Sequence, residues 1–357
     1  MNNNSYPDKF KPDHIQAPAE ISASLDLNTN TIIDFGSGCI NLFLIYPEPC
    51  DAGCSFCYLG AGTEDDSAAK DGVRRDRALC SVDEMIVRVA ENRNMLSRVC
   101  ISATVHPGSF GDAIFLVEKV AKDLNLPVSL KINPLSLKPG DLHLLRDAGA
   151  GKIALVLDAA TEDLYYKHCF QDVDDGRVWN NCWETLEAAA SVFGSESTFC
   201  QLITGLGETE QQLLVAIQNM HDIGAMTNLF PFYADDSSLL EGGKPCPTGQ
   251  FRRMQLASFL IDNNMSAIGH MQFDEEDRVI SFGLKGRALE AVVDSGKPFK
   301  SNHNIGARPC ARIWLTDIKN CEDTLKEQSS MMRSSMSKIR KQLATYSETG
   351  ITARPAL

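Results

Sequence analysis

The chain has 357 residues, of which 43% are hydrophobic, and this is enough for one large α/β domain or two smaller ones. Its formal net charge of -13 argues against nucleic acid or an anionic membrane as the main partner, because both attract a surplus of Lys and Arg. The apolar runs are far shorter than the roughly 20 residues that span a bilayer, and the polar N-terminus has no signal-peptide pattern, so we expect a cytoplasmic protein.

The predicted secondary structure alternates along most of the chain. The first thirty or so residues are polar and have no sustained period, which indicates a loose N-terminal arm. From Ile40 onward, short apolar or β-branched runs alternate with amphipathic stretches. The runs predicted to be strands are 40–47, 98–105, 127–134, 151–159, 198–206 and 228–234. The stretches predicted to be helices are 81–96, 111–124, 139–149, 178–194 and 209–224.

This alternation predicts parallel strands with helices outside them, either as an open doubly wound sheet or as a barrel. Ser81 and Glu84 have the spacing of a capping box, and Gly149 and Gly224 stand where helix C-terminal caps are expected. No run has the pattern of a solvated edge strand. In either fold, ligands bind at the carboxyl ends of the strands.

The pattern loosens after the sixth predicted strand. A helix is predicted over 249–264 and a short hairpin over 271–283. The stretch 315–343 is polar, rich in Met and Ser, and predicted to be helical. No internal repeat is present in the sequence.

The sequence CDAGCSFCY at 50–58 places three cysteines, Cys50, Cys54 and Cys57, directly after the first predicted strand. A four-iron four-sulfur cluster held by three thiolates keeps one iron open, and that iron can bind a chelating small molecule. A structural zinc knuckle or half of a ferredoxin-type site are the alternatives that the spacing leaves open. Twelve cysteines in a cytoplasmic chain indicate metal ligation, catalysis or packing rather than disulfides.

This loop resembles that of the radical S-adenosylmethionine (SAM) superfamily, in which CxxxCxxC follows the first strand of a partial (β/α)6 TIM-like barrel. The aromatic before the last cysteine is here Phe56. The resemblance covers roughly residues 38–260. It implies an N-terminal arm (1–37), a core barrel (38–265) and a C-terminal extension (266–357).

The resemblance also implies the cofactors. A 4Fe-4S cluster would bind the amino and carboxylate groups of SAM at its open iron, and one electron would cleave SAM to methionine and a 5'-deoxyadenosyl radical. A flavodoxin or ferredoxin type of electron donor is implied as a partner.

Several further residues resemble the cofactor shell of the superfamily, and each has a structural alternative. QLITGLGE (201–208) resembles the motif GxIxGxxE, with Gln201 in place of the first Gly and with Ile203, Gly205 and Glu208 in register. Ile203 would pack near the adenine. An ordinary strand-to-helix turn, with Glu208 near a helix N-terminus, explains the same residues.

Four other positions are candidates for binding small molecules. Asp158 could accept from the ribose hydroxyls or cap a helix. Thr104 and His106 stand where the superfamily has a GGE-like turn, and they could hold the methionine end of SAM, although a strand-end His is also a common structural hydrogen bonder. Arg252, next to Arg253, could clamp a carboxylate or form a surface ion pair.

Longer stretches resemble the biotin and lipoyl synthase branch, and particularly the two-protein lipoyl synthase. The stretches that carry this likeness are 39–60, 176–194, 205–210 and 249–262. The likeness implies a sulfurtransferase that inserts sulfur into a protein-bound octanoyl chain. A second radical SAM subunit and an octanoylated carrier protein are then implied as partners.

Sulfur insertion needs a second, sacrificial iron-sulfur cluster, for which the likeness makes Cys39 and Cys310 the candidates. The late motif of that branch has two cysteines, and here Asn304 or a neighbour stands in place of the first. Cys246, His303 or a non-cysteine ligand could complete the cluster, or the two cysteines could be buried structural thiols. The cysteines predicted to serve packing are Cys80, Cys100, Cys169, Cys182, Cys200 and Cys321.

Three functions follow as hypotheses. The first is radical SAM chemistry with sulfur insertion. The second is radical SAM chemistry on a small molecule without sulfur insertion, which the altered segment around Cys310 favours. The third is an iron-sulfur or zinc protein with no catalytic activity.

Overall fold

The structure is a computed structural model, and it describes residues 14–18, 39–44, 46, 48–57, 59, 77–96, 98–138, 140–169, 177–232, 234, 238–299 and 328–344. It describes the backbone alone for residues 14–18, 39, 41, 77–80, 95 and 328–335. Within these residues, no helix has both the length and the apolar character needed to cross a membrane.

All six predicted strands are present, and they form one parallel sheet. In spatial order they are β2 (Cys39–Leu44), β4 (Arg98–Ala103), β5 (Val128–Ile132), β6 (Ala150–Asp158), β7 (Thr198–Thr204) and β8 (Met226–Pro231). Helices connect these strands and cover the sheet, so the prediction of an α/β fold with a partial (β/α)6 barrel is confirmed. The sheet is open, because β8 and a further strand stand at its two ends.

Two strands that the sequence analysis did not predict extend the sheet beyond β2. These are β1 (His14–Pro18), which pairs antiparallel with β2, and β3 (Arg77–Ser81), which pairs antiparallel with β1. β1 falls inside the segment 1–37 that was expected to be an arm. None of the six predicted runs has the pattern of a solvated edge strand, and one of them, β8, is at one end of the strand order, with β3 at the other. Strands β1 and β3 have only five residues each, which is too short for a period to stand out.

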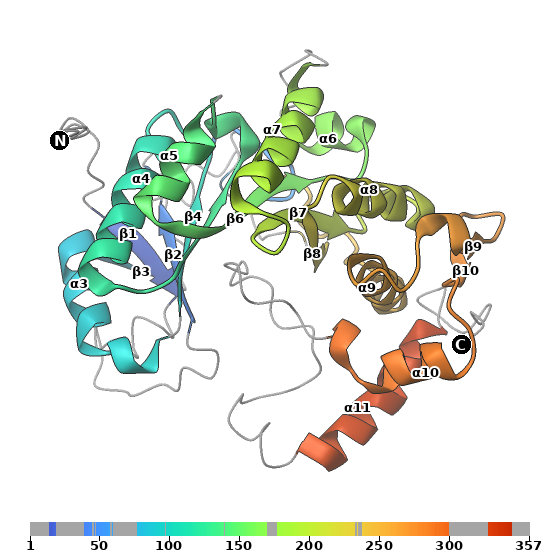
Figure 1. Cartoon of the computed structure of the whole chain (residues 1–357). Coiled ribbons are helices and arrows are strands. Elements are labelled where there is room, and N and C mark those ends of the chain that lie inside the picture. The colour runs from blue at the N-terminus through green and yellow to red at the C-terminus, as the bar shows by residue number, and fades with distance from the viewer. Residues whose placement is uncertain are drawn as a thin grey trace.

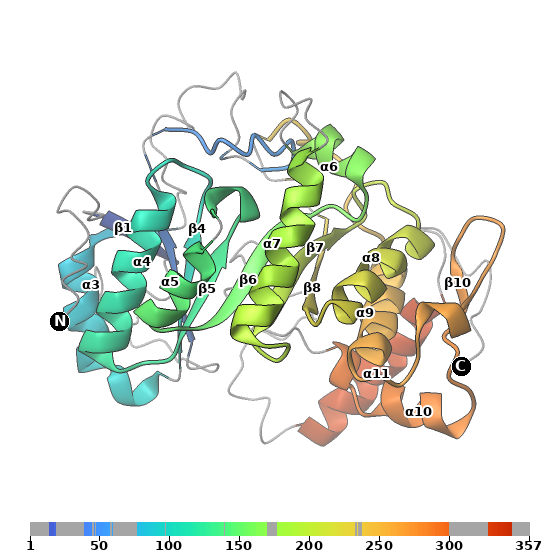
Figure 2. The same ribbon diagram turned by 45° about the horizontal axis from the view of Figure 1, so that its top comes forward.

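The predicted helices lie side by side on one face of the sheet (Figures 1 and 2). They are α3 (Val82–Glu91), α4 (Ser109–Lys119), α5 (Asp141–Ala148), α7 (Arg177–Phe193) and α8 (Glu210–Asp222). Ser81 Oγ accepts a hydrogen bond from Glu84 N at 3.2 Å, as the predicted cap requires. Gly149 ends α5 with a φ of 115°, a conformation that glycine adopts without strain. A helix that was not predicted, α6 (Glu162–His168), begins at Thr161, whose hydroxyl accepts from Leu164 N.

Short helical turns fill several of the connections. They are η2 (Arg93–Met95), η3 (Val120–Leu124), η4 (Pro134–Ser136), η5 (Ile268–His270) and η6 (Lys297–Phe299). Of these, η2 and η3 extend α3 and α4 over the ranges that were predicted as single helices.

The C-terminal part contains the predicted helix and hairpin. Helix α9 (Thr248–Asp262) packs against α8, and the hairpin consists of β9 (Gln272–Phe273) and β10 (Val279–Ser281). Helix α10 (Arg287–Asp294) was not predicted. Helix α11 (Gln328–Leu343) falls in the polar stretch predicted to be helical and packs against α9. Figure 1 shows α10 and α11 next to one another on the side of α9 that is away from β4 and β5.

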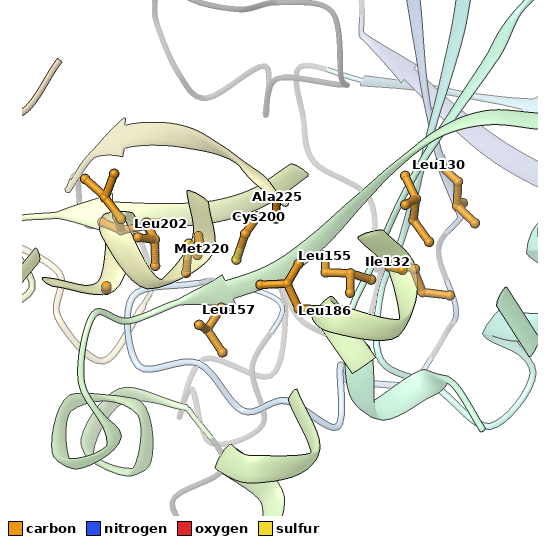
Figure 3. Packing of buried hydrophobic residues seen from close by; sticks show 14 of the residues in the cluster. Leu130, Ile132, Leu155, Leu157, Leu186, Cys200, Leu202, Met220 and Ala225 are labelled. Carbon is orange, nitrogen blue, oxygen red and sulfur yellow. The ribbon is translucent and has the colours of Figure 1, made fainter. Parts of the chain in front are cut away.

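The main core lies between the sheet and these helices (Figure 3). Leu155 on β6 and Leu202 on β7 are buried together with Leu186 of α7 and Met220 of α8. Cys200 on β7 is fully buried among them. The prediction that several cysteines serve packing is thus confirmed for Cys169, Cys182 and Cys200, and Cys100 is also buried.

Candidate functional site

The cysteine loop lies at the carboxyl ends of the parallel strands, as expected for a ligand site in this fold. Cys50, Cys54 and Cys57 are half-buried, and all three line one pocket. The pocket contains about 830 Å³ of space between atoms, counting the part that is open to solvent. The ends of β2, β4, β5 and β6 form its wall, through residues that include Phe43, Ser102, Thr104, Lys131 and Asp158.

Backbone hydrogen bonds fix the loop against the end of β4. Cys50 N donates to Leu59 O at 2.8 Å, and Asp51 N donates to Val105 O at 3.0 Å. Gly53 has a φ of 53°, which lets the chain turn between the first two cysteines. The loop therefore holds its three thiols at one side of the pocket.

His168 at the end of α6 anchors the middle of the loop. Ser55 N donates to His168 O at 2.8 Å, and Ser55 Oγ lies 2.9 Å from His168 Nδ1. His168 Nε2 lies 3.1 Å from Leu206 O, which can only accept, so Nε2 carries the proton. Burial lowers the pKa of His168, which favours the neutral ring, and Nδ1 then accepts from Ser55. The next residue, Phe56, is buried in the core.

The three thiols are the donor set that a three-thiolate iron-sulfur cluster requires. Val105 N donates to Cys50 Sγ at 3.3 Å, and such bonds favour the thiolate and tune cluster potentials. Among the described residues, no three His, Cys, Asp or Glu side chains are placed to hold one metal ion. A zinc knuckle needs four ligands around one ion, whereas a cubane binds each thiolate to a different iron. The loop supplies three thiolates, which is the number that leaves one iron of a cubane open.

A buried hydrogen-bonded chain reaches the wall of the same pocket through Lys131 and Asp158. Asp158, at the end of β6, is 2% exposed and has a φ of 63°, which is rare for a residue other than glycine. Its Oδ1 accepts from Gln201 Nε2 at 2.6 Å, and Gln201 Oε1 accepts from Lys131 Nζ at 3.4 Å. Asp158 does not cap the following helix, because Thr161 does so.

Residues 45–219 match the profile of the radical SAM superfamily. The chain contains a radical SAM domain. No curated protein matches the sequence.

Two solved structures resemble this radical SAM domain and its surroundings. One is SuiB of Streptococcus suis bound to S-adenosylmethionine, which is 15% identical in sequence and has a TM-score of 0.44. The match covers 63% of this chain and 48% of the SuiB chain. The other is HydG, a maturase of the FeFe-hydrogenase, which is 12% identical in sequence and has a TM-score of 0.47. The match covers 71% of this chain and 53% of the HydG chain. The chain spans about half the length of these two proteins.

The motif at the end of β7 forms the turn into α8 of the radical SAM domain. Glu208 accepts from Gly205 N at 2.5 Å and from Leu206 N at 2.9 Å, so its carboxylate closes its own turn. Gly205 has a φ of 97°, and a Cβ there would lie 2.8 Å from Cys246 Cβ, so only glycine fits. Ile203 is buried in β7. The strand-to-helix turn thus accounts for Glu208 and Gly205, and cofactor contact by Ile203, Gly205 and Glu208 stays a prediction.

Glu208 is expected to make the stability of the fold depend on pH. Burial raises its pKa from 4.5 to about 7, against the opposing effect of the backbone N–H groups that it accepts from. Because the folded chain holds this proton more tightly than the unfolded chain, the stabilising contribution is complete below pH 4.5 and is lost as the pH rises through about 7. The loss amounts to roughly 3 kcal/mol at most.

Urea denaturation between pH 4.5 and 8 measures this effect. The variant Glu208→Gln keeps the shape of the side chain and cannot titrate, so it should lack this part of the pH dependence. Parallel loss of stability in the variant and the wild type would contradict the assignment.

Thr104 and His106 have different surroundings in the structure. Thr104 lines the pocket. The His106 ring stacks on Tyr46, with 3.7 Å between ring centroids, and its Nδ1 accepts from Gly108 N at 3.0 Å. His106 Nε2 lies 3.6 Å from Glu48 Oε2. These contacts give His106 a structural role next to the pocket, and contact with SAM stays a prediction for both residues.

Arg252 does not line this pocket. It is buried against α11, where it donates to Gln342 Oε1 at 3.2 Å, and it lies 5.9 Å from the centre of the Phe299 ring. Burial lowers its pKa to about 10. Its neighbour Arg253 pairs with Glu210. Both arginines are buried, so the alternative of a surface ion pair is wrong.

The prediction of a second cluster rests on residues that this structure describes only in part. Cys39 is the first residue of β2, and the cysteine loop follows the other end of that strand. At the usual rise per residue, the two ends of β2 are about 16 Å apart. Cys246 is buried next to Gly205. Cys310, Asn304 and His303 lie outside the described residues.

The sequence analysis missed the role of Lys131. A signal was present, because this lysine interrupts the apolar strand VSLKI, in which every residue is buried. Cys169, which the sequence analysis assigned to packing, is buried in the core as predicted, and it also lines the pocket with the three loop cysteines.

Proposed function

We propose that this protein is a radical SAM enzyme that functionalises an unactivated C–H bond. The observation that carries the proposal is the placement of Cys50, Cys54 and Cys57 on one fixed loop that faces a pocket at the carboxyl ends of the strands. When bound, a 4Fe-4S cluster and SAM supply one-electron cleavage of SAM and a 5'-deoxyadenosyl radical.

The residues of the chain would hold and shield these groups. The three cysteines would bind the cluster, and Val105 N would stabilise the Cys50 sulfur. Phe43, Leu59 and Val105 give the pocket apolar walls that exclude water from a reactive centre. Asp158 lines the same pocket, where it could accept from the ribose hydroxyls of SAM. We further propose a cytoplasmic location and an electron donor of the flavodoxin or ferredoxin type.

The test is cleavage of SAM by the anaerobically reconstituted protein. With dithionite as the reductant, we expect 5'-deoxyadenosine and methionine in equal amounts, measured by liquid chromatography and mass spectrometry. The variant Cys100→Ala removes a buried thiol outside the pocket and should retain this activity. Absence of 5'-deoxyadenosine with every reductant tried would contradict the proposal.

Sulfur insertion of the lipoyl synthase type is the finer version of this proposal, with a second radical SAM subunit and an octanoylated carrier protein as partners. It is supported by the likeness of the long stretches and needs the second cluster. The alternative is radical chemistry on a small molecule without sulfur insertion, which the altered segment around Cys310 favours. Incubation with an octanoyl-lysyl peptide separates the two, since only sulfur insertion gives a thiolated peptide.

One observation favours a function without catalysis. Cys169 lines the same pocket as the three loop cysteines. If it were a fourth ligand, the cluster would have no open iron and would only transfer electrons. That alternative predicts that the cluster needs Cys169.

A further inference from the structure

Two polar side chains meet on neighbouring strands at the wall of the pocket. Ser102 of β4 and Lys131 of β5 are paired in the register of the sheet, so their side chains point to the same face. Both line the pocket, and they are only 5% and 6% exposed. Buried polar groups of this kind are costly unless they have partners, so their position at a ligand pocket calls for an explanation.

The Ser102 hydroxyl has no hydrogen-bond partner among the described residues. A buried hydroxyl in this state loses its bonds to water and gains none in return. The oxygen itself has almost no exposed surface, so a bound molecule could accept from it only once the Ser102 side chain rotates toward the pocket that the residue lines, and that contact would remove the cost.

The ammonium group of Lys131 is held in place by the chain of Gln201 and Asp158. A carboxylate only accepts hydrogen bonds, so the Gln201 nitrogen must face Asp158 and its oxygen must face Lys131. This arrangement aims the Gln201 oxygen at Lys131 Nζ, 3.4 Å away. Gln201 is also the residue that departs from the first glycine of the motif at β7, so this departure creates the contact.

We propose that Ser102 and Lys131 form a subsite for a carboxylate of the substrate. The inference rests on the proposed function, in which the amino and carboxylate groups of SAM are bound by the cluster and a protein-based site is left for a second molecule. The nearby Asp158 carboxylate favours a monoanion over a dianion such as phosphate, because like charges repel. The apolar side chains of Phe43 and Val156 in the same wall would contact the body of the substrate.

The test compares phenylacetate with phenylacetamide, which have the same shape and differ in charge. Isothermal titration of the reconstituted full chain, with SAM present at saturation, should give about 10-fold tighter binding of the acid. In Lys131→Met, which keeps the length of the side chain, the acid and the amide should bind within about twofold of one another. Lys122→Met is the matched control, since Lys122 is exposed and pairs only with Glu118 among the described residues, and its preference should equal that of the wild type.

Ser102→Ala tests the subsite independently if Lys131→Met does not fold. It removes one hydroxyl and should lower the preference for the acid about threefold. Equal binding of acid and amide by the wild type would overturn the proposal, as would an unchanged preference in both variants. Weaker SAM binding in Lys131→Met, with the preference retained, would assign Lys131 to SAM and also overturn it. If the wild type prefers the acid over the amide but makes no 5'-deoxyadenosine, the proposed function is contradicted and the carboxylate subsite is not.

Discussion

Replacement of Cys50, Cys54 and Cys57 together by Ala is expected to remove the iron and sulfide bound at the loop and to abolish SAM cleavage. The three thiols line the pocket from one loop and would be the cluster ligands, and no backbone group can replace a thiolate on iron. The measurement is iron and sulfide per chain after anaerobic reconstitution, with the electron paramagnetic resonance spectrum of the reduced protein.

Cys169→Ala is the matched control for this loss. It makes the same chemical change in the same pocket, and Cys169 is more deeply buried than the loop cysteines. We expect this variant to keep its cluster and a SAM-dependent change in the spectrum. Loss of the cluster in Cys169→Ala would identify a fourth ligand and rule out the open iron.

Iron that remains in the triple variant would have a different meaning. It would place a second cluster elsewhere in the chain and would support sulfur insertion. The variants Cys39→Ala and Cys310→Ala, each made in the triple background, would then identify its ligands.

Glu210→Ala is expected to destabilise the fold by about 3 to 5 kcal/mol, because it leaves a buried guanidinium without its partner. Glu210 and Arg253 are 4% and 2% exposed. Arg253 Nε donates to Glu210 Oε1 at 2.8 Å, and a second bond joins Nη2 to the same carboxylate. Glu210 Oε2 also accepts from Val279 N at 2.8 Å, which connects α8 and α9 to the hairpin. The free energy of unfolding from urea titration gives the measurement.

Two further variants test the reason for this loss. Replacing both partners by apolar residues, as in Glu210→Leu with Arg253→Met, should recover most of the stability, since no charge is left buried. Glu290→Ala removes a partly exposed partner of Arg340 and should cost less than about 1 kcal/mol. A Glu210→Ala variant as stable as Glu290→Ala would show that the buried pair contributes little.

The repeating part of the fold could be predicted because its strands and helices have clear periods. The runs 98–105 and 151–159 became β4 and β6 with small changes at their ends. The cysteine loop was predicted from its spacing and from its place after a strand. β1 and α6 were missed since five and seven residues hold too little of a period to be recognised.

The polar contacts inside the fold could not be predicted from the sequence. The sequence shows Glu210 and Arg253 as two ordinary charges 43 positions apart, and only the packing of α9 against α8 and α11 buries them. In the same way, Lys131 and Gln201 are 70 positions apart, and they come together because only β6 separates β5 from β7 in the sheet. Local patterns predict elements, whereas these pairs depend on how the elements are assembled.

The strand β1 protects the part of the sheet from which the cysteine loop begins. Gln16 pairs with Phe43, so β1 covers the edge of β2 that β4 does not occupy. A chain shortened to begin at residue 38 would present that edge, with buried Leu42 and Leu44 next to it, as a template for strand pairing between molecules. Shortened chains made for crystallisation should therefore keep residues 14–18, even though they precede the matched range 45–219, to avoid aggregation during cluster reconstitution.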